Sequence, residues 1–144
     1  VVDTSGVFDD QALAALDRSD SIILVGTLDI PALKGLKLAA STLDLLNFSR
    51  DSWSFVLNRA NAKVGLSQAE YESTLGVKAD ATLVSSREVL AAVNRGEALV
   101  SAYPGNANSK ALVAFAGALS SKHAAAEQDA PAERKSSRRR LRKG

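Results

Sequence analysis

The chain has 144 residues, of which 46% are apolar, a proportion that suits one packed domain with a core of its own. It holds no cysteine and a single histidine, which excludes a disulfide framework and any metal cluster built on thiolates or several histidines. The net charge of +2 is uneven, because residues 1–126 carry 11 basic and 13 acidic side chains and residues 127–144 carry 7 and 3. The chain has no methionine, so we expect the sequence to begin inside a longer protein.

Apolar runs and helix caps alternate along the chain. SIILV at 21–25 shows no polar alternation and is typical of a central parallel strand covered on both faces. Asp29 followed by Pro31 predicts a helix start, and Ser67 with Glu70 predicts a capping box. Strands are expected at 1–2 (the end of a buried strand), 21–25, 53–57 and 81–84, and helices at 11–16, 29–46, 67–75, 87–94 and 110–122.

This order of elements predicts an α/β fold with a mostly parallel sheet flanked by helices. We expect one α/β domain over residues 1–122 and a disordered, basic tail over residues 123–144. Ligands of such sheets bind beyond the carboxyl ends of the strands. Candidate site residues therefore follow the predicted strands, at 3–4, 26–27, 58–59 and 85–86.

The first motif is Val-Val-Asp-Thr-Ser-Gly at residues 1–6. An aspartate directly after an apolar strand can hold a water of a Mg²⁺ shell, and a Thr-Ser-Gly loop can respond to a γ-phosphate. A plain turn cap would show the same residues. Asp3 and Thr4 are therefore candidates for the catalytic and metal-linked positions, with Asp3 acting on Mg²⁺ through water.

The second motif is Phe-Val-Leu-Asn-Arg at residues 55–59. The Asn58 amide offers both a donor and an acceptor, which the edge of a purine base requires. Asn61 stands where a guanine-specific protein would need an acceptor-only carboxylate, so the pattern favours adenine weakly. An ordinary turn at a strand end remains the alternative.

The third motif is the loop Val84, Ser85 and Ser86, followed by a helix that Gly96 is expected to end. By itself this pattern indicates only a loop, a helix and a glycine stop.

Taken together, the motifs resemble those of the ParA/MinD group of P-loop ATPases, and most of all its CpaE/TadZ-like branch, which is associated with Flp (tight adherence) pilus assembly. The likeness covers residues 1 to about 119 and is carried by VVDTSGVFDDQALAALDRSD, LVGTLDIPALKGLKLAASTLDLL, FVLNRANAKVGLS and LVSSREVLAAVNRGEALV. The resemblance implies that residues 1–122 are the C-terminal portion of a ParA/MinD-like nucleotide-binding domain. It implies ATP and Mg²⁺ as cofactors, with Asp3 as the switch aspartate on the Mg²⁺ water shell. It implies that Asn58 and Arg59 lie at the base and that Val84, Ser85 and Ser86 flank adenine.

Two departures from the family pattern affect function. Val84 stands where the family usually has proline, so the adenine loop is expected to differ in shape. The phosphate-binding loop GKGGxGK[ST] is missing, and the chain holds no Gly-x-x-x-x-Gly-Lys-[Ser/Thr] at all. Phosphoryl transfer depends on that loop and its lysine. We expect an incomplete P-loop domain that is inactive alone, whereas a full-length parent is the candidate ATPase.

The resemblance implies an ATP-binding switch in pilus assembly or polar positioning. It implies a homodimer formed through the nucleotide face, pilus or secretion assembly proteins as partners, and a cytoplasmic protein at the membrane or a cell pole. The alternatives are a non-catalytic localisation scaffold with a degenerate site and a DNA-associating partitioning ATPase. The basic run at 134–143 fits DNA phosphates or an anionic membrane surface, and a solvated tail equally well.

Overall fold

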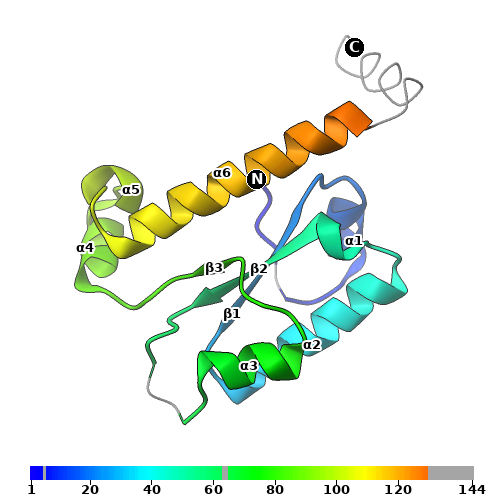
Figure 1. Cartoon of the computed structure of the whole chain (residues 1–144), viewed down its shortest axis with the longest axis horizontal. Helices are drawn as coiled ribbons and strands as arrows, with labels where there is room; N and C mark the ends of the chain where they lie inside the picture. Colours follow the sequence, from blue (N-terminus) through cyan, green and yellow to red (C-terminus); the bar gives the residue numbers. More distant parts are fainter. Residues whose placement is uncertain (5, 63–64, 130–144) are drawn as a thin grey trace.

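The computed structural model describes residues 1–4, 6–62 and 65–129 (Figure 1). Its elements confirm an α/β fold in which helices flank a parallel sheet. They are α1 (Asp10–Asp17), β1 (Ile22–Thr27), α2 (Ile30–Leu45), the 3-10 turn η1 (Arg50–Ser52), β2 (Trp53–Asn58), α3 (Gln68–Leu75), β3 (Ala81–Thr82), α4 (Arg87–Arg95), α5 (Leu99–Ala102) and α6 (Ala107–Asp129).

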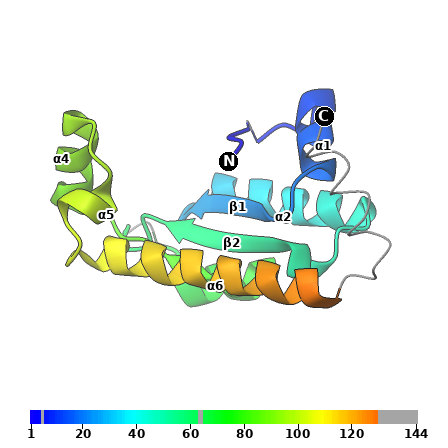
Figure 2. The same ribbon diagram turned by 90° about the horizontal axis from the view of Figure 1, so that it is seen from above.

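The sheet has the order β1-β2-β3, and its neighbouring strands run parallel. β1 and β2 pair from Ile22↔Trp53 to Thr27↔Asn58, so the two strands end at the same level. Helices α2 and α3 lie on one side of the sheet and α6 on the other (Figures 1 and 2). β2 is the central strand, and its first five residues are buried.

Short-range signals produced the predicted helix starts. Asp29 accepts a hydrogen bond from the backbone N–H of Ala32 (2.8 Å), which satisfies a free donor in the first turn of α2. Ser67 and Glu70 form the complete capping box of α3. Gly96 ends α4 with a φ of 66°, in the left-handed region that suits glycine.

β1 lies at the edge of the sheet, so the prediction of a central strand covered on both faces is wrong. Ile23 and Val25 leave 44% and 61% of their surface exposed, on the face of β1 opposite the α2 core. Val1 and Val2 are also exposed and form no strand, against the predicted end of a buried strand. Nothing among the described residues, Val1 and Val2 included, pairs with the outer edge of β1.

Helix α6 is longer than the sequence pattern suggested. It begins at Ala107 and continues to Asp129, beyond the predicted boundary at 122, so residues 123–129 are helical rather than part of a disordered tail. The alanines at 124–126 are strong helix formers and continue the helix. Residues 130–144 lie outside the described residues. None of the described helices combines the length and the hydropathy that a membrane crossing requires.

The core lies between the sheet and helices α2 and α3. Phe55 on β2 and Tyr71 on α3 are fully buried, and their rings stack with centroids 5.9 Å apart. The Tyr71 hydroxyl is buried without a hydrogen-bond partner in the described structure. Burial raises its pKa to about 12, and the negative charge of Asp29 adds to the shift.

Replacing Tyr71 by phenylalanine is expected to keep or raise the free energy of unfolding at neutral pH, by up to about 1 kcal/mol, because a buried hydroxyl without a partner is lost. The unfolded tyrosine ionises near pH ~10 and the folded one near 12, so its contribution is lost as the pH rises through this interval. The variant should therefore lose less stability than the parent there. Urea titrations at neutral and alkaline pH measure both effects, and a marked loss at neutral pH would contradict the assignment.

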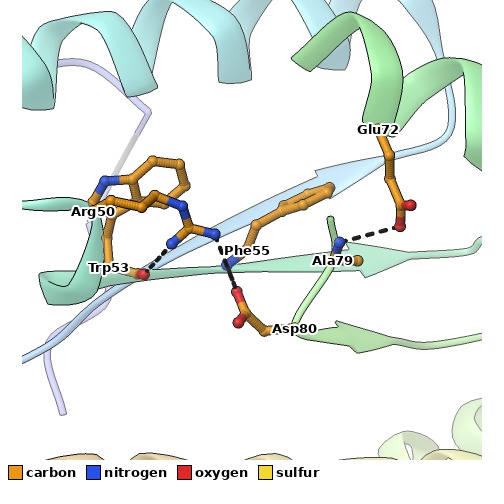
Figure 3. Close-up of polar contacts among 6 residues, drawn as sticks. All are labelled: Arg50, Trp53, Phe55, Glu72, Ala79 and Asp80. Atoms are coloured by element: carbon orange, nitrogen blue, oxygen red, sulfur yellow. Dashed lines mark hydrogen bonds and ion pairs between the residues drawn. The ribbon is translucent and has the colours of Figure 1, made fainter. Parts of the chain in front are cut away.

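Asp80 joins the start of β3 to β2 (Figure 3). The backbone N–H of Phe55 donates to the Asp80 carboxylate (2.8 Å), and the backbone N–H of Asp80 donates to the Phe55 carbonyl (2.8 Å). Arg50 donates to the Trp53 carbonyl (2.7 Å) and stacks over the Trp53 ring at 4.0 Å, with its second nitrogen 3.8 Å from Asp80. The carboxylate thus extends the β2–β3 ladder by one side-chain bond.

Replacing Asp80 by alanine is expected to lower the free energy of unfolding by about 2 kcal/mol, because the buried N–H of Phe55 loses its acceptor. Asparagine keeps an acceptor oxygen and gives up only the partly exposed ion pair with Arg50, so Asp80→Asn should cost less than about 1 kcal/mol. Chemical denaturation of the two variants measures the difference. Equal losses would assign the effect to the ion pair instead of the hydrogen bond.

Candidate functional site

The carboxyl ends of the strands place Asn58 and Arg59 at the rim of the sheet. Asn58 is the last residue of β2 and is half-buried, and its side-chain oxygen accepts a hydrogen bond from the backbone N–H of Arg59 (2.9 Å). This contact accompanies a left-handed backbone at Arg59, with a φ of 53°. The chain therefore turns sharply at this point, with the Asn58 amide at the strand end.

The loop after β3 lies against the same turn. Leu83 donates its backbone N–H to the Leu57 carbonyl (2.8 Å), and its own carbonyl accepts from the N–H of Ala60 (2.9 Å). The loop residues Val84–Ser86 follow at once. The structure thus brings together two of the predicted groups, Asn58 with Arg59 and Val84 with Ser85 and Ser86.

Two asparagines that sequence reasoning did not assign to this role hold the backbone of the loop. Asn108, on α6, accepts from the N–H of Val84 (2.9 Å) and donates to its carbonyl (2.7 Å). Asn61 accepts from the N–H of Ser85 (2.8 Å) and donates to its carbonyl (3.3 Å). Each pair is separated by 24 residues, so no local sequence signal could have revealed it.

The Asn61 contacts change the argument about base preference. Asn61 was the position expected to separate adenine from guanine. Both ends of its amide are engaged with Ser85, so the side chain faces the loop. The preference for adenine that Asn61 suggested therefore has no support in the structure.

Ser86 caps helix α4. Its hydroxyl accepts a hydrogen bond from the backbone N–H of Val89 (3.4 Å). The pKa of the neighbouring Glu88 is lowered, first by its own backbone N–H and then by the Ser86 hydroxyl. Carboxylates are favoured at helix starts, so this part of the loop has an evident structural role.

The strand end of β1 carries a similar cap. Thr27 donates its hydroxyl to the Asp29 carboxylate, which also caps α2. The pKa of Asp29 is lowered, chiefly by the Thr27 hydroxyl and then by the Ala32 N–H. The candidate position at residues 26–27 therefore takes part in a local helix cap.

Asp3 and Thr4 lie beside β1, in the walls of a cavity of about 440 Å³. The cavity separates the N-terminal segment and α1 from β1 and α2, and much of its wall is apolar, including Phe8, Leu16, Ile22, Leu24, Leu36 and Leu43. Within the described residues no hydrogen bond joins Asp3 or Thr4 to the Asn58 rim. Ser5, in the same motif, lies outside the described residues.

The residues present fit a purine base better than a phosphate chain. The rim offers a half-buried amide and a loop held by hydrogen bonds, which suits a flat polar ring edge. The described part of the chain holds no cluster of three or more acidic, histidine or cysteine side chains that could bind a metal.

No protein-family model matches the sequence, and no curated protein does either. Solved structures do match. A ParA family ATPase from Chlorobium tepidum TLS superposes with a TM-score of 0.67 at 17% identity, covering 76% of this chain and 46% of the ATPase. The chain has the ParA/MinD fold.

MinD cell division proteins from Aquifex aeolicus agree with this assignment of the fold. MinD in its complex with MinC gives a TM-score of 0.66 at 15% identity, covering 79% of this chain and 48% of that one. MinD alone gives 0.63 at 16% identity, covering 76% and 47%. The chain thus spans about half the length of these proteins with the ParA/MinD fold. The CpaE/TadZ branch does not appear among these three structures.

Proposed function

We propose that this chain supplies the base-binding part of an ATP-dependent switch of the ParA/MinD type. One observation supports the proposal above all. Asn58 and the loop at 84–86 lie together at the carboxyl ends of β2 and β3, in a sheet with the ParA/MinD fold. Open sheets of this class bind ligands at that end, and a half-buried amide group there matches the edge of adenine.

In this proposal some contacts with the nucleotide come from this chain and others from residues outside the 144. Asn58 and Arg59 contact the base, and Val84, Ser85 and Ser86 flank it. Asp3 holds a water of the Mg²⁺ shell, with Thr4 in the adjoining switch loop. A glycine-rich loop with its lysine, which these 144 residues lack, grips the phosphates. The 144 residues alone are therefore not expected to hydrolyse ATP.

The finer assignment is a role in pilus assembly or polar positioning, with a homodimer through the nucleotide face and pilus or secretion assembly proteins as partners. The four sequence segments that resemble the CpaE/TadZ branch support it. The solved MinC:MinD complex gives a precedent, since a protein of this fold is seen there with a partner. A cytoplasmic protein that sits at the membrane or a cell pole follows from the same assignment.

A localisation scaffold with a degenerate nucleotide site is the second candidate. The valine at position 84 and the serine pair at 85–86 favour it. The residues encoded before Val1 separate the two candidates. A GKGGxGK[ST] motif there supports the ATPase, and the loss of its lysine supports the scaffold.

A DNA-associating partitioning ATPase is the third candidate, and it depends on the basic run at 134–143, which lies outside the described residues. DNA binding that weakens steeply with salt and disappears when 134–144 are deleted would support it. Binding to anionic vesicles with the same dependence would assign the run to a membrane surface instead.

Adenosine binding tests the proposed base site on the chain itself. Titrating adenosine into ¹⁵N-labelled protein should shift the amide signals of residues 58–60 and 84–86. Asn58→Ala should weaken binding about tenfold, which corresponds to the loss of one hydrogen bond of about 1.4 kcal/mol. Asn94→Ala, on the exposed side of α4, is the matched control and should bind as the parent does. Shifts confined to other residues, or none, would refute the base site.

The role of Asp3 needs the polypeptide that includes the residues encoded before Val1. Mg²⁺-dependent ATP turnover should fall by about 100-fold or more in Asp3→Ala if this carboxylate organises the metal's water shell. ATP binding in the absence of Mg²⁺ should change little. Unchanged turnover would remove Asp3 from the proposal.

A further inference from the structure

Asn108 closes a two-point contact with the loop that follows β3. It is 3% exposed, and its amide pairs with both the N–H (2.9 Å) and the carbonyl (2.7 Å) of Val84. The N–H and C=O of one residue in a neighbouring antiparallel strand would make the same pair of bonds. The side chain therefore takes the place of a strand just after β3 ends at Thr82, where no further strand of the described residues pairs.

The start of α6 holds Asn108 in place. The Asn108 backbone N–H donates to the Asn106 side chain (2.9 Å), which fixes the helix start. The next residue, Ser109, is also buried and donates to the carbonyl of Tyr103 (2.7 Å). Figure 1 shows this first turn of α6 next to α4 and α5. Val84 is thus tied to a buried, well-bonded corner of the fold.

Asn61 holds the same loop from the opposite side. It comes from the turn after β2 and pairs with the N–H and the carbonyl of Ser85. The backbone N–H and C=O groups of two consecutive loop residues are therefore satisfied by side-chain amides from two separate elements. The Leu83 backbone is bonded to the β2 side as well. The loop cannot move relative to Asn58 without breaking these bonds.

We propose that Asn108 and Asn61 are positioning residues for the base site. We further propose that Asn108 couples the position of the first turn of α6 to the affinity for the base. This inference rests on the proposed function, since the loop matters for binding only if a base lies against it. The coupling is reciprocal. Displacement of the first turn of α6 weakens base binding, and a bound base stabilises the packing of that turn against the loop. A partner that grips α6 would regulate the nucleotide site by this route.

The test compares Asn108→Ala, Asn108→Asp and the surface control Asn94→Asp in the 144-residue chain. Two quantities are measured: hydrogen exchange of the Val84 amide, and affinity for adenosine by NMR titration. Asn108→Ala should speed Val84 exchange, whereas Asn108→Asp, which keeps the acceptor for the Val84 N–H, should speed it less. Both variants should weaken adenosine binding by about tenfold at neutral pH, the factor for one hydrogen bond of about 1.4 kcal/mol. The control should change neither quantity.

The aspartate variant adds a signature that a merely destabilised fold lacks. Ionised aspartate keeps the acceptor for the Val84 N–H and loses the donor to its carbonyl. Burial beside that carbonyl raises the pKa of the new carboxyl group. Protonation restores the donor, so adenosine affinity of Asn108→Asp should recover as the pH is lowered, whereas Asn108→Ala should show no recovery.

The outcomes separate the two levels of the argument. Unchanged exchange at Val84 in Asn108→Ala would show that the Asn108–Val84 hydrogen bonds do not hold the loop. Faster exchange with unchanged adenosine affinity would overturn the positioning role. A parent chain that does not bind adenosine would overturn the proposed function and the positioning role together. The exchange data would still test the Asn108–Val84 hydrogen bonds. Recovery of affinity in both variants at low pH would overturn the assignment of the donor to Asn108.

Discussion

Replacing Gly26 by alanine is expected to lower the free energy of unfolding by about 3 kcal/mol. A Cβ at this position would lie 2.2 Å from Cδ1 of Leu36 and 2.8 Å from the Tyr71 hydroxyl. Leu36 and Tyr71 both belong to the buried cluster under the sheet, and Tyr71 is stacked on Phe55, so neither side chain has free space into which to withdraw. An added methyl group in such a core forces strain of this size.

Gly35 supplies the matched control for this substitution. It lies in α2, one residue before Leu36, and a Cβ there meets nothing within 4 Å. Gly35→Ala is therefore expected to stabilise the chain by about 0.5–1 kcal/mol, through helix propensity alone. Urea denaturation of the parent and both variants measures the two opposite effects. A Gly26→Ala protein as stable as the parent would show that β1 and α2 pack more loosely than the structure indicates.

Self-association of the 144-residue chain is the second large effect that we expect. β1 is an edge strand, its outward-facing Ile23 and Val25 are exposed, and an apolar-walled cavity adjoins it. Exposed edges and apolar faces of this kind pair with other chains. At micromolar concentration the chain should sediment as dimers or larger species, and Val25→Lys should shift it to monomers because a charge on the edge opposes pairing.

Val113→Lys is the matched control, since Val113 on α6 has 63% of its surface exposed against 61% for Val25. This variant should associate as the parent does, because α6 offers no unpaired strand. Sedimentation velocity at several concentrations distinguishes the three proteins. A parent chain that is monomeric and melts sharply and cooperatively would contradict the expectation, and equal effects of both lysines would assign it to net charge alone.

Local signals in the sequence were sufficient for most helix boundaries. The capping box of Ser67 with Glu70, the Asp29 cap and the Gly96 stop each depend on residues three or four positions apart. Such contacts form in any chain that adopts the helix, so a pattern of neighbouring residues predicts them. The longer α6 shows the limit, because the composition after Lys122 suggested a tail and the structure continues the helix to Asp129.

The candidate site was predicted in part, for a physical reason. Alternating strands and helices imply parallel strands, and parallel strands end at one rim, so Asn58 and the loop at 84–86 could be expected to meet. The location of Asp3 and Thr4 was harder to predict, because it depends on which strand lies next to the N-terminal segment. Those two residues line the cavity beside β1, and their role stays a prediction.

The sequence by itself determined the helix caps, the parallel α/β class and the strand ends that carry the candidate residues. Only the tertiary structure decided that β1 is an edge strand, that Val1 and Val2 pair with nothing in the described chain, and that Asn61 and Asn108 hold the loop. The reason is the separation along the sequence between the residues that make each contact. Caps and periodicity are contacts between near neighbours, whereas strand order and amide pairs across 24 residues depend on how distant segments pack.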